Sequence, residues 1–84
     1  MERYTTREGK AVRVPPDQLE AALERLARFE DMALGLEQER ADIAQKLAAL
    51  REQGRDRTVQ FRELLAQKLS NANMLLLLER WKLR

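Results

Sequence analysis

Cysteine and histidine are both absent from the 84 residues of this chain. Without cysteine the chain can form no disulfide and can offer no thiolate to a metal ion. Without histidine it lacks the commonest general base and the commonest metal ligand, and no Ser/His/Asp set can be assembled. Glycine occurs only three times, and no glycine-rich phosphate-binding loop is present. These absences predict a protein that is not an enzyme and that binds neither a cofactor nor a metal.

Long apolar runs are missing too. The longest uninterrupted stretch is Met74–Leu78, whereas a helix that spans a bilayer needs about 20 apolar residues. The first residues, Met1–Arg7, carry charges with no apolar run behind them, unlike a secretion signal. We therefore expect a soluble, cytoplasmic protein with no membrane partner.

Aromatic residues make up only 5% of the chain, whereas apolar residues reach 44% and charged residues 36%. This mixture is typical of helical bundles and coiled coils. A chain of 84 residues is also near the lower limit at which a single core holds a fold, so association between copies would be an ordinary source of stability. The composition predicts the all-α class and an oligomer.

A heptad repeat runs through residues 17–53 and predicts one long helix that lies against other helices. A proline pair precedes it, and Asp17 with Glu20 would form a capping box if Asp17 is the N-cap. Nine of the ten a and d positions are apolar, and Arg40 is the exception. In chain order these seam positions are Leu19, Ala22, Leu26, Phe29, Ala33, Leu36, Arg40, Ile43, Leu47 and Leu50.

A second apolar stripe follows the same predicted helix and consists mostly of small residues. Its members are Leu23, Ala27, Leu34, Ala41, Ala44 and Ala48. A two-stranded coiled coil needs only one stripe, so two stripes favour at least two neighbouring helices, as in a four-helix bundle. Gly35 lies outside the seam, which favours one continuous helix; a break within residues 33–36 is the alternative.

The segment after the long helix predicts an antiparallel helical hairpin. Gly54 follows the last periodic residue and is a favoured helix stop, and the connection to the next helix is short. We expect the second helix over residues 57–82. Its apolar face would hold Phe61, Leu65, Leu69, Ala72 and Leu76, widened by Leu64, Leu75 and Leu78.

Residues 1–16 differ from the rest because they contain β-forming residues on both sides of Glu8–Gly9. Arg3–Val14 could form a small β-hairpin, with a flexible arm as the alternative. An isolated two-stranded hairpin is marginal in water and would need to pack on something else. We therefore divide the chain into an N-terminal arm or β-hairpin, residues 1–16, and a helical hairpin, residues 17–84.

The predicted helices carry more apolar surface than one folded-back pair can cover. The first helix is longer than the second by about 15 Å, so a second subunit, the N-terminal segment or both must cover its early leucines. We predict a homodimer or tetramer. The expected interface residues are Leu19, Leu23, Leu26, Phe29, Leu36, Ile43, Leu69, Leu75, Leu76, Leu78 and Trp81.

The net charge of +2 is unevenly distributed. Residues 17–52 hold five basic and nine acidic groups, a net charge of −4, and residues 53–84 hold seven basic and three acidic groups, a net charge of +4. Such segments attract each other when they lie side by side. The basic segment also raises an alternative, a small protein associated with nucleic acid. Its contacts would come from Arg55, Arg57, Arg62, Arg80, Lys82 and Arg84.

The segment Arg25–Asp31, with the sequence RLARFED, and the segment Arg3–Arg7, with the sequence RYTTR, carry a family resemblance. Together they resemble small coiled-coil proteins encoded in prophages and mobile elements of Gram-positive bacteria. That group has no assigned activity, so the resemblance implies only a phage-like context. The prediction is a non-catalytic structural module, acting as a scaffold, adaptor or accessory factor, that contacts another protein through its helices.

Overall fold

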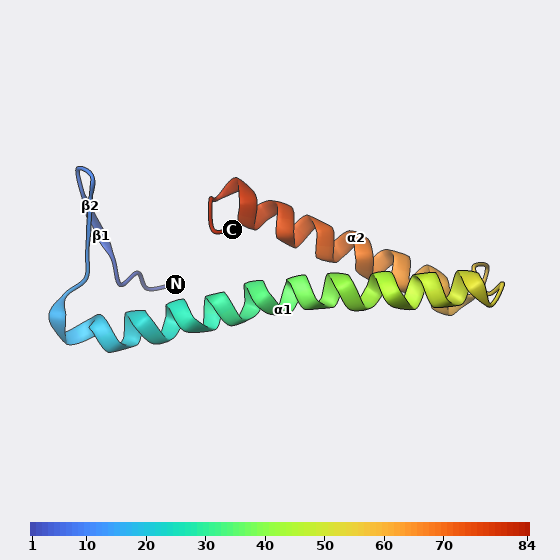
Figure 1. Ribbon diagram of the computed structural model, residues 1–84. Helices are drawn as coiled ribbons and strands as arrows, with labels where there is room; N and C mark the ends of the chain where they lie inside the picture. Colours follow the sequence, from blue (N-terminus) through green and yellow to red (C-terminus); the bar gives the residue numbers. More distant parts are fainter. The chain divides into compact units, whose positions relative to one another are not determined.

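The computed structural model describes all residues from Met1 to Arg84 and is mostly helical (Figure 1). The chain forms two compact units, an N-terminal unit, Met1–Asp31, and a C-terminal unit, Met32–Arg84. No helix combines the length and apolarity needed to cross a lipid bilayer. In chain order the elements are β1 (Thr6–Glu8), β2 (Ala11–Arg13), a 3-10 turn η1 (Pro16–Gln18), α1 (Leu19–Glu52) and α2 (Val59–Arg80).

Strands β1 and β2 form the predicted β-hairpin rather than a flexible arm. They pair antiparallel, with Glu8 opposite Ala11, and Gly9 and Lys10 form the turn between them. Gly9 has φ +59°, a left-handed conformation that glycine adopts without steric cost and that two-residue hairpin turns require. Every residue of the two strands is exposed, so local pairing rather than burial holds this hairpin.

The start of α1 differs from the predicted capping box. Pro15 is the N-cap of the 3-10 turn, which has no side-chain cap, and the turn leads directly into α1. Asp17 therefore lies inside the turn and is not an N-cap. Beyond this point α1 is one unbroken helix, and Gly35 sits within it facing open space. The continuous helix is thus the correct alternative.

Gly54 ends the long helix, as predicted. Its N–H donates to the Arg51 carbonyl at 3.0 Å and the Arg55 N–H donates to the Leu50 carbonyl at 2.8 Å. This pair of bonds satisfies the last carbonyls of α1 and is favoured by glycine, here with φ +68°. Thr58 then caps α2 by accepting a hydrogen bond from the Phe61 N–H at 3.2 Å.

The end of α2 repeats the same turn without a glycine. The Lys82 N–H donates to the Glu79 carbonyl at 3.0 Å, and the Leu83 N–H donates to the Leu78 carbonyl at 2.9 Å. Lys82 has φ +56°, an unfavourable value for a residue with a Cβ atom. The turn places Arg84 where it can reach α1.

Helices α1 and α2 pack against each other in the C-terminal unit, where α2 runs back along the part of α1 that belongs to the same unit (Figure 1). The antiparallel direction follows from two contacts: Arg51 lies over the Phe61 ring, and Asn71 bonds to Leu36. The buried seam consists of Leu36, Ile43, Leu47 and Leu50 from α1, and Phe61, Leu64, Asn71, Leu75 and Leu78 from α2. On α1 these are the predicted a and d positions.

The apolar face predicted for α2 is only partly buried. Phe61, Leu64, Leu75 and Leu78 are buried, whereas the other four predicted members, Leu65, Leu69, Ala72 and Leu76, are exposed. The buried residues of α2 instead follow the 3-and-4 spacing that starts at Phe61, which places Asn71 and the exposed Lys68 along the seam. Because polar residues occupy two of the seam positions, a count of apolar residues selects the neighbouring face.

The leucine run at the end of α2 is only partly buried within the single chain. Leu75 and Leu78 lie in the seam, whereas Met74, Leu76 and Leu77 are each about half exposed. A helix that is apolar on all sides is stable only when it is covered on all sides. A single chain does not provide that cover.

Candidate interaction surface

The C-terminal unit has an uncovered apolar side, which we call the open face. On α1 the second apolar stripe lies roughly 130° around the helix from the buried seam, and on α2 the exposed leucines lie roughly 110° from it. All of these side chains are exposed. The open face consists of Leu34, Ala41, Ala44 and Ala48 from α1, and Leu65, Leu69, Ala72 and Leu76 from α2.

Both stripes border the same side of the helix pair. A surface groove of about 350 Å³ lies beside the seam, and Arg40 from α1 lines it together with Ala72 and Leu76 from α2. Arg40 lies between the α1 seam and the α1 stripe, and the two α2 residues belong to the open face. Viewed along each chain from its N-terminus, both stripes lie in the same rotational direction from the seam. Because the two helices are antiparallel, that direction leads to the same side of the pair on both helices. The two stripes therefore make one surface.

Two cations on this side lack an acidic partner. Arg40 and Lys68 both line the groove, both are exposed, and neither takes part in an ion pair. Their side chains stand next to apolar residues, where long basic side chains lay their methylene groups along the surface and keep their charge in water. The open face is thus an apolar strip with positive charge beside it.

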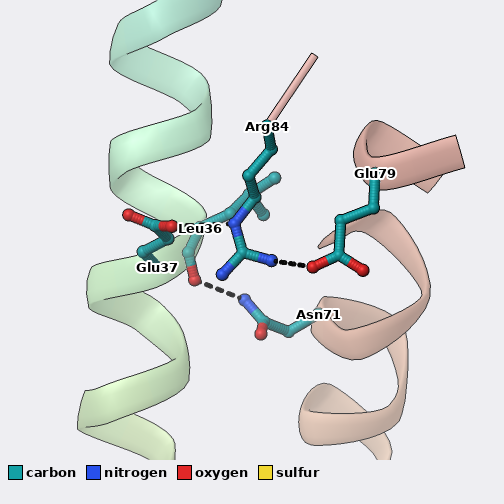
Figure 2. A network of polar contacts seen from close by, with 5 residues as sticks. All are labelled: Leu36, Glu37, Asn71, Glu79 and Arg84. Atoms are coloured by element: carbon teal, nitrogen blue, oxygen red, sulfur yellow. Dashed lines mark hydrogen bonds and ion pairs between the residues drawn. The ribbon is translucent and has the colours of Figure 1, made fainter. Parts of the chain in front are cut away.

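A polar network fixes how α2 lies on α1 (Figure 2). Asn71 is 2% exposed, and its Nδ2 atom donates to the Leu36 carbonyl at 2.8 Å and to the Glu39 Oε1 atom at 3.1 Å. Burying an amide is favourable only when its hydrogen bonds are satisfied, so a shifted register of α2 would carry a cost. We interpret Asn71 as the residue that sets the register.

Arg84 closes the other end of this network. Its Nε atom lies 2.7 Å from Glu37 Oε1, and its Nη1 atom lies 2.8 Å from Glu79 Oε1 (Figure 2). The Arg84 side chain is 25% exposed, so these ion pairs are shielded more than ordinary surface pairs. Arg84 thereby links the segment after α2 to both helices through ion pairs.

The predicted interface residues differ in burial and fall into three groups. Leu36, Ile43, Leu75 and Leu78 are buried between the helices of the single chain, where they are not accessible to a partner. Phe29 is half-buried. The others remain exposed: Leu19, Leu23, Leu26, Leu69, Leu76 and Trp81.

In the N-terminal unit, residues near the start of the chain pack on α1 through Arg25. Its guanidinium lies 4.1 Å from the centre of the Tyr4 ring, and its Nη1 atom donates to the Glu2 carbonyl at 2.6 Å. Sequence reasoning missed this contact, because nothing in the two segments reveals that the chain returns to α1 here.

The N-terminal residues leave the early leucines of α1 uncovered. Tyr4 lines a surface groove together with Ala21, Arg25 and Arg28, which are on the side of α1 roughly opposite the stripe of leucines. The members of that stripe, Leu19, Leu23 and Leu26, are each about half exposed. The sequence analysis allowed either the N-terminal segment or a second subunit to cover these leucines. The N-terminal segment does not cover them.

The residues of the nucleic-acid alternative do not form one patch. Arg55, Arg57 and Arg62 lie at the interhelical turn or the first turns of α2, whereas Arg80 and Lys82 lie at its far end. The rise of an α-helix puts about 27 Å between Arg62 and Arg80. The sixth residue, Arg84, is held by two carboxylates. Only separate small groups of cations face the solvent.

No group of three or more carboxylates lies close enough together to hold a metal ion. Comparisons with protein-family models, with curated proteins and with solved structures found no match to this chain. The resemblance to coiled-coil proteins of prophages therefore stays a prediction. The interaction surface has to be interpreted from its own residues.

Proposed function

We propose that this protein is a non-catalytic helical interaction module that associates with a second copy of itself and serves as a scaffold, adaptor or accessory factor. The observation that supports this proposal is the large exposed surface of the chain. The chain has 7295 Å² of accessible surface, whereas a monomeric globular protein of this mass exposes roughly 5,200 Å². The excess of about 2,100 Å² is larger than the area of about 800 Å² that each partner contributes to a standard protein interface.

The exposed surface is also unusually apolar. Eight large apolar side chains are buried, whereas fifteen are exposed. Scattered apolar residues are normal on a protein surface, but contiguous apolar strips mark interaction sites. The open face is such a strip, because its residues follow one another at helical spacing on two adjacent helices.

A second copy of the chain has the properties that these surfaces require. Residues 17–52 carry a net charge of −4 and residues 53–84 a net charge of +4, so each copy presents both signs to the other. Two-fold symmetric dimers are the commonest oligomers. A dimer of helical hairpins would be a four-helix bundle, and two dimers would form a tetramer through any apolar surface that the dimer leaves uncovered.

The mass of the protein in solution tests this proposal. Light scattering coupled to size-exclusion chromatography should give twice the chain mass of 9.8 kDa, or four times that mass for a tetramer. Circular dichroism on the same sample should show a helical protein. A helical particle of 9.8 kDa that persists at the highest attainable concentration would contradict the proposal.

The nucleic-acid alternative lacks a comparable observation, because its basic residues lie in separate groups. A fluorescence titration with random-sequence DNA at low and high salt would test it directly. Binding through phosphate contacts loses affinity steeply as salt rises. We expect no binding at low salt, and tight salt-sensitive binding would favour this alternative.

A further inference from the structure

The geometry of the open face points to a particular mode of dimerisation, an inference that depends on the proposed self-association. We infer that the open faces of two copies pack on each other with α1 of one copy against α2 of the other, and with the two-fold axis parallel to the helices. Each helix would then have two antiparallel neighbours, one from its own chain and one from the partner. The result is an antiparallel four-helix bundle.

Side-chain size is the first argument for pairing α1 with α2 of the partner. The α1 half of the open face presents three alanines and one leucine, whereas the α2 half presents three leucines and one alanine. Small residues allow a neighbouring helix to approach closely, and large residues fill the space above them. If α1 faced α1 of the partner, mostly alanines would meet on the α1 side of the interface and mostly leucines on the α2 side. That arrangement would leave gaps on the α1 side and overlaps on the α2 side.

Charge is the second argument. In the C-terminal unit, residues 32–52 of α1 hold four acidic and three basic groups, a net charge of −1, and α2 holds three basic and two acidic groups, a net charge of +1. Pairing α1 with α1, or α2 with α2, would therefore place segments of the same net sign together. Like charges at an interface disfavour association. Pairing α1 with α2 places segments of opposite net sign together in both halves of the dimer, and the unpaired cation Lys68 of α2 then borders the acidic α1 of the partner.

The contacts inside one chain predict which residues meet. Leu36 lies level with Asn71, and Arg51 lies level with Phe61, so residues at the same height on α1 and α2 have numbers that add up to about 110. A two-fold axis parallel to the helices preserves height. Across the interface we therefore expect the pairs Ala41 with Leu69, Ala44 with Leu65, and Leu34 with Leu76.

Introduced cysteines test this arrangement by disulfide cross-linking. The chain has no cysteine of its own, so every disulfide must involve the introduced residues. The variants Ala41→Cys and Leu69→Cys are unfolded together, refolded as a mixture and oxidised. A disulfide requires Cα atoms within about 7 Å, so only facing positions cross-link efficiently. We expect the mixed Ala41→Cys/Leu69→Cys disulfide to exceed either self-linked product several-fold on a non-reducing gel. Lys46→Cys, an exposed position away from the open face, is the matched control and should cross-link poorly with Leu69→Cys.

A second pair, Ala44→Cys with Leu65→Cys, keeps the test decisive if one variant misfolds. Before oxidation the light-scattering mass of each mixture separates two kinds of failure. A dimer whose main product is Ala41→Cys linked to itself would overturn the inferred pairing and leave the self-association intact. A monomeric mass for the parent chain would remove the proposed function and the pairing together.

Discussion

The two units of the molecule contain the same helix but differ in what holds them together. In the N-terminal unit no residue is buried, and its long-range contacts are polar or aromatic, such as those of Arg25 with Glu2 and Tyr4. In the C-terminal unit the helices enclose all nine buried residues of the chain, eight of them apolar. Helix propensity and the heptad pattern continue through both units of α1. The difference teaches that an apolar stripe predicts a surface that needs a partner, whereas burial depends on whether the partner is in the same chain.

The largest expected difference between the units comes from matched leucine truncations. Leu47 is 2% exposed within the main apolar cluster, so Leu47→Ala should lower the free energy of unfolding by about 3 kcal/mol. Leu23→Ala removes the same atoms from the N-terminal unit, where Leu23 is 55% exposed, and should cost less than about 1 kcal/mol. Urea unfolding followed by circular dichroism measures both values. Equal losses would remove the distinction between the units.

A smaller effect is expected from the buried amide of the C-terminal unit. Asn71→Ala removes two hydrogen bonds and leaves the Glu39 carboxylate without this donor, so it should cost about 2 kcal/mol. Asn73→Ala, two residues away and exposed, should change the free energy of unfolding by less than about 0.5 kcal/mol. The same urea experiment compares them. If the two variants unfold alike, Asn71 does not anchor α2.

Asn71→Leu tests the register separately from stability. Replacing a buried polar group by an apolar residue of similar size is often neutral or stabilising, but it removes a device that specifies one alignment of two helices. We expect unfolding to change little and amide signals of α2 to become doubled or broadened in a two-dimensional NMR spectrum. A single sharp set of signals would mean that the apolar seam alone sets the register.

In the N-terminal unit we expect a local effect. The cation–π contact of Arg25 with Tyr4 is worth about 0.5–1 kcal/mol at a partly exposed site. Tyr4→Ala, Arg25→Ala and the double variant form a thermodynamic cycle, measured by hydrogen exchange of the amides in residues 2–13. The single variants should speed exchange there and leave exchange of the C-terminal unit unchanged. Additive effects of the two substitutions would show that the contact contributes nothing.

The smallest effect concerns the turn at Lys82, whose φ of +56° is unfavourable for any residue except glycine. Lys82→Gly should raise the free energy of unfolding by about 0.5 kcal/mol, since relief of the strained backbone is partly offset by greater freedom of the unfolded chain. Lys82→Ala removes the side chain without that relief and serves as the control. Thermal unfolding should rank glycine above lysine and alanine. A destabilised glycine variant would indicate that the lysine side chain itself stabilises the turn.

Much of the architecture could be predicted from the sequence because its signals are local. The heptad spacing identified Leu36, Ile43, Leu47 and Leu50 as seam residues, and all four are buried. Gly9 and Gly54 marked turns because both positions require a backbone conformation that glycine adopts freely. Signals of this kind depend only on neighbours in the chain.

The remaining features depend on residues far apart in the sequence. The buried face of α2 was predicted only in part, because Asn71 lies in its seam and an asparagine is favourable there only through bonds to α1. The contact of Tyr4 with Arg25 and the return of Arg84 to Glu37 have the same origin. The open face was predicted only in part, since Leu69 and Leu76 were placed on the same apolar face of the second helix as Phe61 and also in the oligomer interface. Only the rotation of α2 about its own axis separates the buried members of that face from the exposed ones.

The dependence of thermal unfolding on protein concentration tests the central claim most directly, namely that one chain leaves apolar surface that a second copy must cover. When unfolding separates two chains, the midpoint temperature Tm rises with protein concentration. We predict a clear rise in Tm across a concentration range of about a hundredfold, and a loss of that rise in Leu69→Asp, whose charge would lie on the open face. A Tm that is the same at every concentration for the parent chain would contradict the account.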